Sequence, residues 1–145
     1  MTGTIGTEPG DTGVDTATAQ LHAAMPFTAS LGATTVSSSP EEVRLRLGWD
    51  LARCTAGGLL HGGALMALAD SAGALCAFLN LPEGATGTAT TTSSTHFLRG
   101  VRSGHVDAVA RPLNVGRSVI VIDTELRDDT GRLVARVTQT QAVLR

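Results

Sequence analysis

The 145-residue sequence predicts an α+β protein in which an antiparallel sheet wraps around one long central helix. Nearly every side chain in the segment 64–79 is apolar or small, so it has no polar stripe to face water and indicates a buried helix. Segments with the two-residue alternation of strands lie on both sides of it and are joined by short turns. This order is typical of a helix packed on one face of an antiparallel sheet.

The N-terminal part of the chain predicts a tail and a short helix. Residues 1–16 are rich in Thr, Gly and Asp and carry little apolar surface, so we expect a disordered tail ahead of a single domain at 17–145. A short helix is expected over residues 15–24, and residues 25–31 are expected to form a turn.

A hairpin is predicted next, from the segments 32–38 and 41–49. Val43, Leu45 and Leu47 alternate with more polar residues, which is the period of a half-buried strand. A loop of small residues then leads to the central helix. Four further strands follow the helix, and we expect them at 85–98, 105–113, 117–127 and 132–144.

Composition excludes several kinds of chemistry. The net charge is −2, all eleven basic residues are arginine, and the chain contains neither lysine nor tyrosine. A Schiff-base lysine, a phosphate-loop lysine and a tyrosine acid are therefore excluded. The near-neutral charge, with three phenylalanines and one tryptophan, argues against a nucleic-acid surface.

The two cysteines and the N-terminal residues indicate a cytoplasmic protein. Cys54 and Cys76 are expected to be free thiols, and the first ten residues have neither a basic start nor an apolar run. A membrane span at 62–79 is disfavoured because a central aspartate costs roughly 2.5–3.5 kcal/mol on insertion scales. The flanks of that segment also carry no basic anchor.

Asp70 and the glycines at the start of the helix are the most informative residues. Asp70 is the only charge in the apolar helix, and such a carboxylate is costly unless it is paired or used. Gly62 and Gly63 stand where the N–H groups have no partner inside the helix and point toward developing negative charge. Gly62 and Asp70 are eight residues apart, roughly 12 Å along a helix axis. One reacting carbon can meet both only if they come from different copies of the helix, which predicts a composite site in a homo-oligomer.

At this point the sequence resembles the hotdog-fold acyl-CoA thioesterases, in the branch of phenylacetyl-CoA and hydroxybenzoyl-CoA thioesterases. The features that carry the resemblance span residues 26–144. They are Leu60-His61-Gly62-Gly63, the acid Asp70 nine residues after the histidine, the strand end Thr95-His96-Phe97-Leu98-Arg99 followed by Gly104, and the hairpin Asp128-Asp129-Thr130-Gly131-Arg132. The resemblance implies a hotdog fold, an acyl-CoA substrate and a dimer or a dimer of dimers, and therefore a homotetramer in the second case. It implies no metal and no cofactor.

The resemblance also assigns roles to individual residues. Asp70 becomes the nucleophile or general base, the Gly62 amide donates to the thioester oxygen, and His61 orients that turn. Thr55 stands where the family often has Asn or Gln. Thr90 is the closest match to a strand residue that holds the water or the acid, with Thr91 and Thr92 as alternatives that differ in strand parity.

The substrate is expected to meet further residues. Gly63 would supply a second amide beside Gly62, and Arg99, Arg102 and Arg117 lie near strand ends, where they could meet the phosphates of coenzyme A. A solvated role for these arginines is the alternative.

Purely structural roles are the alternatives to the catalytic roles of these residues. Asp70 could be an acid satisfied by backbone amides or by a symmetry partner, and His61 could cap the helix without touching substrate. A triad of Ser71, His96 and Asp70 is disfavoured because Ser71 adjoins Asp70 on the helix and faces away from it. A metal site from His61, Cys54 and Asp70 is disfavoured because no two of these candidates have metal-binding spacing.

The leading functional hypothesis is hydrolysis of an acyl-CoA thioester, with an aromatic acyl group suggested by the resemblance. An acid that attacks or activates water and an amide that stabilises the oxyanion fit that reaction, and a thiolate leaves without a general acid. The second hypothesis is a non-catalytic module that binds acyl-CoA as a sensor or scaffold. A hydratase or dehydratase is the third, disfavoured because no histidine accompanies Asp70 on the helix.

Overall fold

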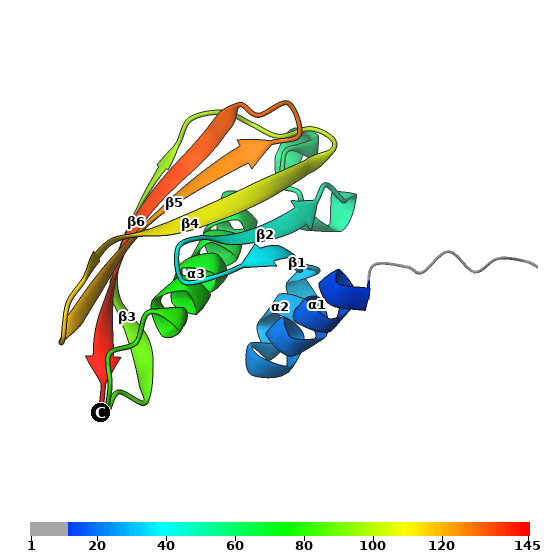
Figure 1. Ribbon diagram of the computed structural model, residues 1–145. Coiled ribbons are helices and arrows are strands. Elements are labelled where there is room, and N and C mark those ends of the chain that lie inside the picture. Colours follow the sequence, from blue (N-terminus) through cyan, green and yellow to red (C-terminus); the bar gives the residue numbers. More distant parts are fainter. Residues whose placement is uncertain (1–11) are drawn as a thin grey trace, which may run out of the picture.

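The computed structural model describes residues 12–145 and confirms the α+β architecture (Figure 1). Two short helices, α1 (Thr12–Ala24) and α2 (Pro26–Leu31), precede a hairpin of β1 (Thr34–Ser38) and β2 (Val43–Gly48). A loop with two short 3₁₀ turns leads to the long helix α3 (Gly62–Leu79). The remaining strands are β3 (Gly87–Phe97), β4 (His105–Val115), β5 (Val119–Asp128) and β6 (Leu133–Leu144).

All six strands form one antiparallel sheet in the order β1-β2-β4-β5-β6-β3. The hairpin adds beside β4, whereas β3, the first strand after α3, crosses to the far side and pairs with the last strand, β6. Strands β1 and β3 are therefore the two edges. The sheet curves around α3, which packs against β2 through β6 (Figure 1). This is the arrangement expected of a hotdog fold.

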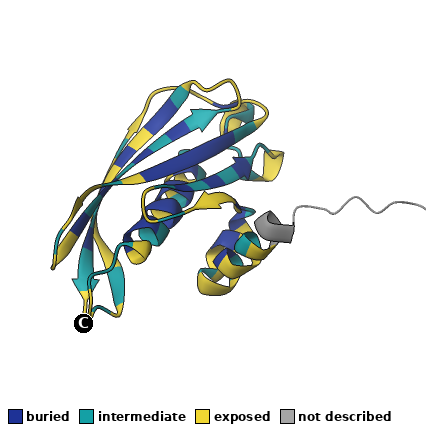
Figure 2. Ribbon diagram, in the orientation of Figure 1, coloured by how far each residue is buried: buried dark blue, intermediate teal, exposed yellow. Residues whose placement is uncertain are grey.

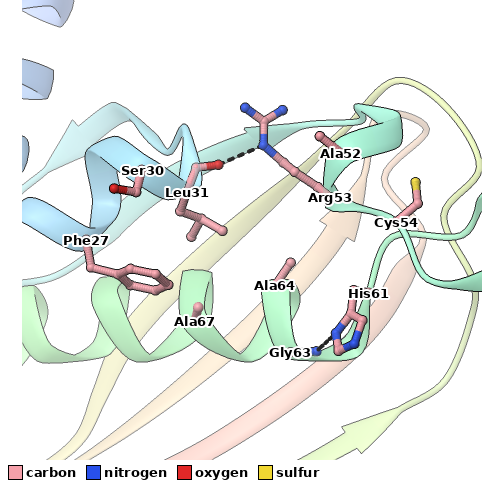
Figure 3. A pocket seen from close by; sticks show the side chains of 10 residues that line it. All are labelled: Phe27, Ser30, Leu31, Ala52, Arg53, Cys54, His61, Gly63, Ala64 and Ala67. Atoms are coloured by element: carbon pink, nitrogen blue, oxygen red, sulfur yellow. Dashed lines mark hydrogen bonds between the residues drawn. The ribbon is translucent and has the colours of Figure 1, made fainter.

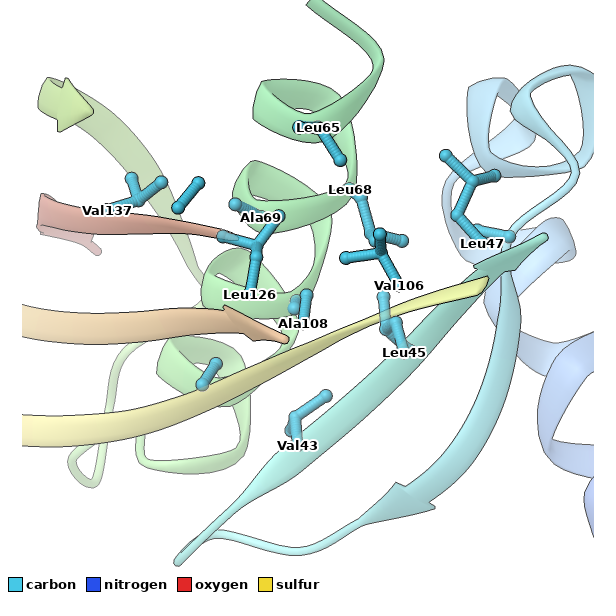
Figure 4. Close-up of a cluster of buried hydrophobic side chains, with 14 of the residues drawn as sticks. Val43, Leu45, Leu47, Leu65, Leu68, Ala69, Val106, Ala108, Leu126 and Val137 are labelled. Carbon is cyan, nitrogen blue, oxygen red and sulfur yellow. The ribbon is translucent and has the colours of Figure 1, made fainter. Parts of the chain in front are cut away.

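Alternating burial along the strands explains why the sheet holds α3 on one face. In β2, Val43, Leu45 and Leu47 are fully buried and alternate with half-buried residues, and β5 follows the same pattern (Figure 2). The buried side chains meet Leu65 and Leu68 of α3 (Figure 4). The hairpin and the four later strands that the sequence predicts are thus present within a few residues of the expected limits.

Helix α3 is buried on one side only. Met66 is 43% exposed, Phe78 is 53% exposed, and Asp70 is exposed as well. The expectation of a helix buried all round is therefore wrong for the single chain, because the one sheet covers only the face that packs on it. On the opposite face, Met66 and Phe78 are left open to solvent on either side of Asp70.

The N-terminal region differs from the sequence prediction in two places. Helix α1 begins at Thr12, so residues 12–16 are helical rather than part of a tail, and residues 1–11 lie outside the described part of the chain. The expected turn before β1 is the short helix α2. Pro26 starts it at a position that tolerates the missing N–H, and Gly32 ends it in the left-handed region at φ +86°.

Helix α3 is long and apolar enough to cross a membrane by length and composition alone. Its packing against five strands of the sheet instead identifies it as the core helix of this fold.

Candidate active site

The start of α3 presents one free amide. His61 is the N-cap residue, and its Nδ1 accepts a hydrogen bond from the Gly63 N–H at 2.8 Å. The amides of Ala64 and Leu65 donate to the His61 carbonyl. Within the described residues, the Gly62 N–H has no partner, so it is the donor available to a substrate oxygen. The expectation that Gly63 supplies a second amide is wrong in this geometry, because the His61 ring occupies that N–H.

The loop before α3 is held in place by hydrogen bonds from both sides. Trp49 Nε1 donates to the Gly58 carbonyl at 2.9 Å, and Arg53 Nε donates to the Leu31 carbonyl at 2.7 Å. The His61 N–H donates to the Arg53 carbonyl at 2.9 Å, and Leu60 pairs with Val101. These contacts position the turn at His61 and therefore the direction of the free Gly62 amide.

Two clefts flank the helix start. One, of about 410 Å³, lies between α2, the loop and α3 and includes Phe27, Cys54 and His61 (Figure 3). The other, of about 360 Å³, lies on the opposite side and includes Thr55, Gly62 and Arg99. Its remaining lining residues are Leu59, Leu60, Leu65, Phe97, Leu98 and Gly100.

The second cleft brings together residues that the sequence predicts for the site. The Phe97 ring lies against Gly62, where an added Cβ would be 3.2 Å from the ring Cζ. The structure therefore joins Thr55, Gly62 and Arg99 in one cleft, with the aromatic ring of Phe97 beside Gly62. Phe97 belongs to the motif that carries the resemblance, but the motif does not predict its contact with Gly62.

Asp70 is held by two donors through one oxygen. Thr90 Oγ1 donates to Asp70 Oδ1 at 3.2 Å, and Gln139 Nε2 donates to the same oxygen at 3.1 Å. Thr90 in turn accepts from Gln141 Nε2 at 2.7 Å. Asp70 Oδ2 has no hydrogen-bond partner among the residues the structure describes. The carboxylate thus presents Oδ2 on the exposed face of α3.

A bulge in β3 decides which threonine meets the acid. Thr90 pairs with Gln141, and the register then shifts so that Thr92 pairs with Thr140. The extra residue, Thr91, donates through Oγ1 to the Thr140 carbonyl at 3.2 Å. The bulge turns Thr90 toward α3, so the structure brings together Asp70 and the threonine favoured from the sequence.

Gln139 was missed by the sequence reasoning. It is fully buried on β6, and the signal for it was present in the alternation of that strand. If Val137 faces the helix, then Gln139 and Gln141 face it as well, in positions where a core strand ordinarily carries apolar residues. Two buried amides in such a strand indicate polar partners on the helix.

The three arginines expected at coenzyme A are not together. Arg99 lines the cleft at Gly62, and Arg102 Nη1 donates to the Gly57 carbonyl at 3.0 Å. Arg117 lies at the other end of the sheet, because its turn adjoins the end of β6 at Val143, whereas Arg99 adjoins Val134 near the start of β6. Nine strand residues at about 3.3 Å each separate these ends by about 30 Å. Within one chain, the expected cluster is therefore wrong for Arg117.

The competing constellations do not assemble. Ser71 Oγ donates to the Ala67 carbonyl of its own helix at 2.8 Å, and His96 pairs in register with Arg136 on β6. Among residues 12–145, no group of three or more His, Cys, Asp or Glu side chains is arranged to hold a metal ion. Burial raises the pKa of the Cys76 thiol to about 11, so that group is a poor nucleophile.

Comparison with known proteins agrees with this geometry. Residues 57–135, which include the helix start, Asp70 and most of the later strands, match the thioesterase superfamily. The proofreading thioesterase EntH of Cronobacter sakazakii is 34% identical over 115 residues, covering 71% of this chain and 83% of EntH. The chain belongs to the thioesterase superfamily.

Solved structures show the same fold. Thioesterase HI1161 of Haemophilus influenzae superposes with a TM-score of 0.80 at 29% identity, covering 87% of each chain. A mutant of the phenylacetic acid degradation protein PaaI of Thermus thermophilus superposes with a TM-score of 0.75 at 28% identity, covering 82% of this chain and 99% of PaaI. Esterase-named relatives from Haemophilus influenzae and Pseudomonas aeruginosa are 42% and 40% identical over 83 residues. Those matches span 56% of this chain and 59% and 57% of the relatives.

Proposed function

We propose that this chain hydrolyses an acyl-CoA thioester to a free acid and coenzyme A. The proposal rests on the presence of two groups on one helix. These are a free Gly62 amide at the start of α3 and an Asp70 carboxylate on its exposed face. Membership of the thioesterase superfamily supports the reaction class. Water is the only co-substrate that the reaction needs. The cytoplasmic location stays a prediction.

The proposed chemistry uses both groups at the same thioester carbonyl. The Gly62 N–H donates to the thioester oxygen and stabilises the negative charge that forms there when the carbonyl carbon is attacked. Asp70 Oδ2 either attacks that carbon or takes a proton from the water that does. The C–S bond then breaks, and the sulfur leaves as the thiolate of coenzyme A, which is a good leaving group. With direct attack by Asp70, water hydrolyses the resulting anhydride in a second step.

The site is proposed to form between two subunits. Gly62 and Asp70 are separated by eight residues of continuous helix, or about 12 Å, which one carbonyl group cannot span. Helix α3 leaves Met66, between them, and Phe78 exposed, and the neighbouring strand β3 is an unpaired edge. An exposed apolar face beside a free edge is suited to a second copy of the chain. We propose that the chain forms a homodimer, and that two such dimers associate into a homotetramer.

The substrate assignments follow from the clefts. Arg99, beside the free amide, is proposed to bind a phosphate of coenzyme A. An apolar cleft of about 370 Å³ lies one helix turn beyond Asp70 and includes Met25, Ala74 and Phe78. We propose that this cleft binds the apolar acyl group of the substrate. The acyl group is proposed to be aromatic, as the resemblance implies.

Thiol release from a panel of aromatic and aliphatic acyl-CoA esters tests the function. The intact chain should release coenzyme A, and Asp70→Asn should lose about 10²–10⁴-fold in kcat while keeping its circular dichroism spectrum and Tm. Asp107→Asn is the matched control, since Asp107 pairs with Arg46 on the sheet, away from the proposed site. Tight binding of acyl-CoA without thiol release by the intact chain would favour the sensor or scaffold instead.

A further inference from the structure

We propose that Gln139, seated in the notch that Gly73 leaves in α3, is the positioning residue that aims the Asp70 carboxylate. The inference rests on the proposed function of Asp70. Gln139 lies on β6, 69 residues away in the chain, and reaches the acid through Nε2 at 3.1 Å. It does not touch the proposed substrate position, and it acts through the orientation of Asp70.

The notch is a specific fit between Gly73 and Gln139. A Cβ added at Gly73 would overlap the Oε1 and Cδ atoms of the Gln139 amide. Gly73 stands in the interior of α3, where glycine ordinarily destabilises a helix relative to alanine. The glycine is explained if the amide must lie in that space, three residues along the helix from Asp70.

The amide is kept although it costs stability. Gln139 is fully buried, and its Oε1 has no hydrogen-bond partner among the described residues. A buried acceptor without a partner carries a desolvation penalty that an apolar side chain of the same shape would avoid. The contact that Gln139 does make is the one to Asp70. The hydrogen bond from Gln139 Nε2 to Asp70 therefore explains why the chain carries an amide here, although the Oε1 atom of that amide has no partner among the described residues.

The second donor makes the alignment complete. Gln141 donates to Thr90, so the acceptor side of that hydroxyl is engaged and its single proton is directed to Asp70 Oδ1. Two donors on Oδ1, from β6 and from β3, fix the rotation of the carboxyl group about its terminal bond. Oδ2 is then held toward the exposed face, where the substrate is proposed to lie.

The test separates an effect on the orientation of Asp70, read from kcat, from an effect on stability, read from Tm. Gln139→Met removes the donor and the orphan oxygen while keeping an unbranched side chain of similar length. We expect kcat to fall about 10–100-fold with KM within about two-fold, because a small misorientation of the reacting group acts on the chemical step. Tm should be unchanged or raised. Thr124→Val is the matched control, since Thr124 is equally buried, also has a hydroxyl without a partner among the described residues, and makes no hydrogen bond to Asp70. It should keep its kcat.

Gly73→Ala provides an independent variant. A Cβ at Gly73 overlaps the Gln139 amide, so Gly73→Ala displaces that amide, and the higher helix propensity of alanine offsets part of the cost in stability. We expect kcat to fall to a similar degree as in Gln139→Met, and the double variant to be no worse than either single variant, because one change removes the amide that the other displaces. Gln139→Met or Gly73→Ala with unchanged kcat, or with kcat and Tm lost in proportion, would overturn the inference. Full activity of Asp70→Asn would instead overturn the proposed function.

Discussion

His61 Nδ1 accepts the Gly63 N–H at 2.8 Å, and this contact selects Gly62 as the free amide at the start of α3. The ring thus has a structural task that explains its place in the motif. With Nδ1 as acceptor, the ring proton is on Nε2 in the neutral form. The Nε2–H is not needed for the cap, so its contribution to substrate binding is open to a direct test.

Replacing Gly62 by proline should remove the proposed oxyanion donor without breaking the helix. Proline is tolerated at the first helical position, and the preceding residue, His61, has the extended ψ of 133° that a following proline requires. We expect kcat to fall about 10²–10³-fold in steady-state thiol release. Gly62→Ala is the control, because it places a Cβ against Phe97, as proline does, but keeps the N–H, and it should lose far less. Equal losses in both variants would show that crowding, and not the amide, is responsible.

His61→Ala should lower the free energy of unfolding by about 0.5–2 kcal/mol, the usual cost of losing an N-cap side chain. His61→Asn should recover that loss, since asparagine also accepts from the backbone at an N-cap. Chemical denaturation measures both. If His61 acts only through the cap, His61→Asn also keeps kcat within about three-fold of the parent. A stable but inactive His61→Asn would reveal a direct role for the imidazole.

Mixing two inactive variants should restore activity if the site is shared between subunits. Asp70→Asn removes the carboxylate of the site, and Gly62→Pro removes its oxyanion donor. In a heterodimer one site carries both changes and the other carries neither. Random exchange makes half of the dimers mixed, so co-expressed chains should regain about one quarter of the parent activity. Activity that stays at the level of the separate variants would place both groups of a working site in one chain.

Cys76 should make the protein less stable in alkali. Burial raises the pKa of its thiol from 9.0 to about 11, so in this range the unfolded chain has lost a proton that the folded chain still holds. The free energy of unfolding therefore falls as the pH rises from about 9 to about 11. Urea denaturation across this range should show a shallower fall in Cys76→Ala. Cys54→Ala, which alters the half-buried thiol in the loop, is the matched control and should fall as the parent does.

Much of the fold and part of the site could be predicted because their signals are local. Hydrophobic alternation located β2, and the uniformly apolar segment located α3, since each period is a property of neighbouring residues. The eight-residue spacing of Gly62 and Asp70 likewise needed only the rise of a helix. These features, together with the motif around His61, sufficed to indicate the hotdog fold and the thioesterase superfamily.

The tertiary structure alone decided how the acid is held and which amide is free. Thr90 faces Asp70 because a bulge at Thr91 changes the parity of the edge strand, and parity depends on pairing with a distant strand. Gln139 reaches the same carboxylate across 69 residues because antiparallel pairing brings β6 under α3. Such contacts cannot be predicted from the composition of one segment. Their geometry depends on the register between strands that are distant in the sequence and meet only in the folded chain.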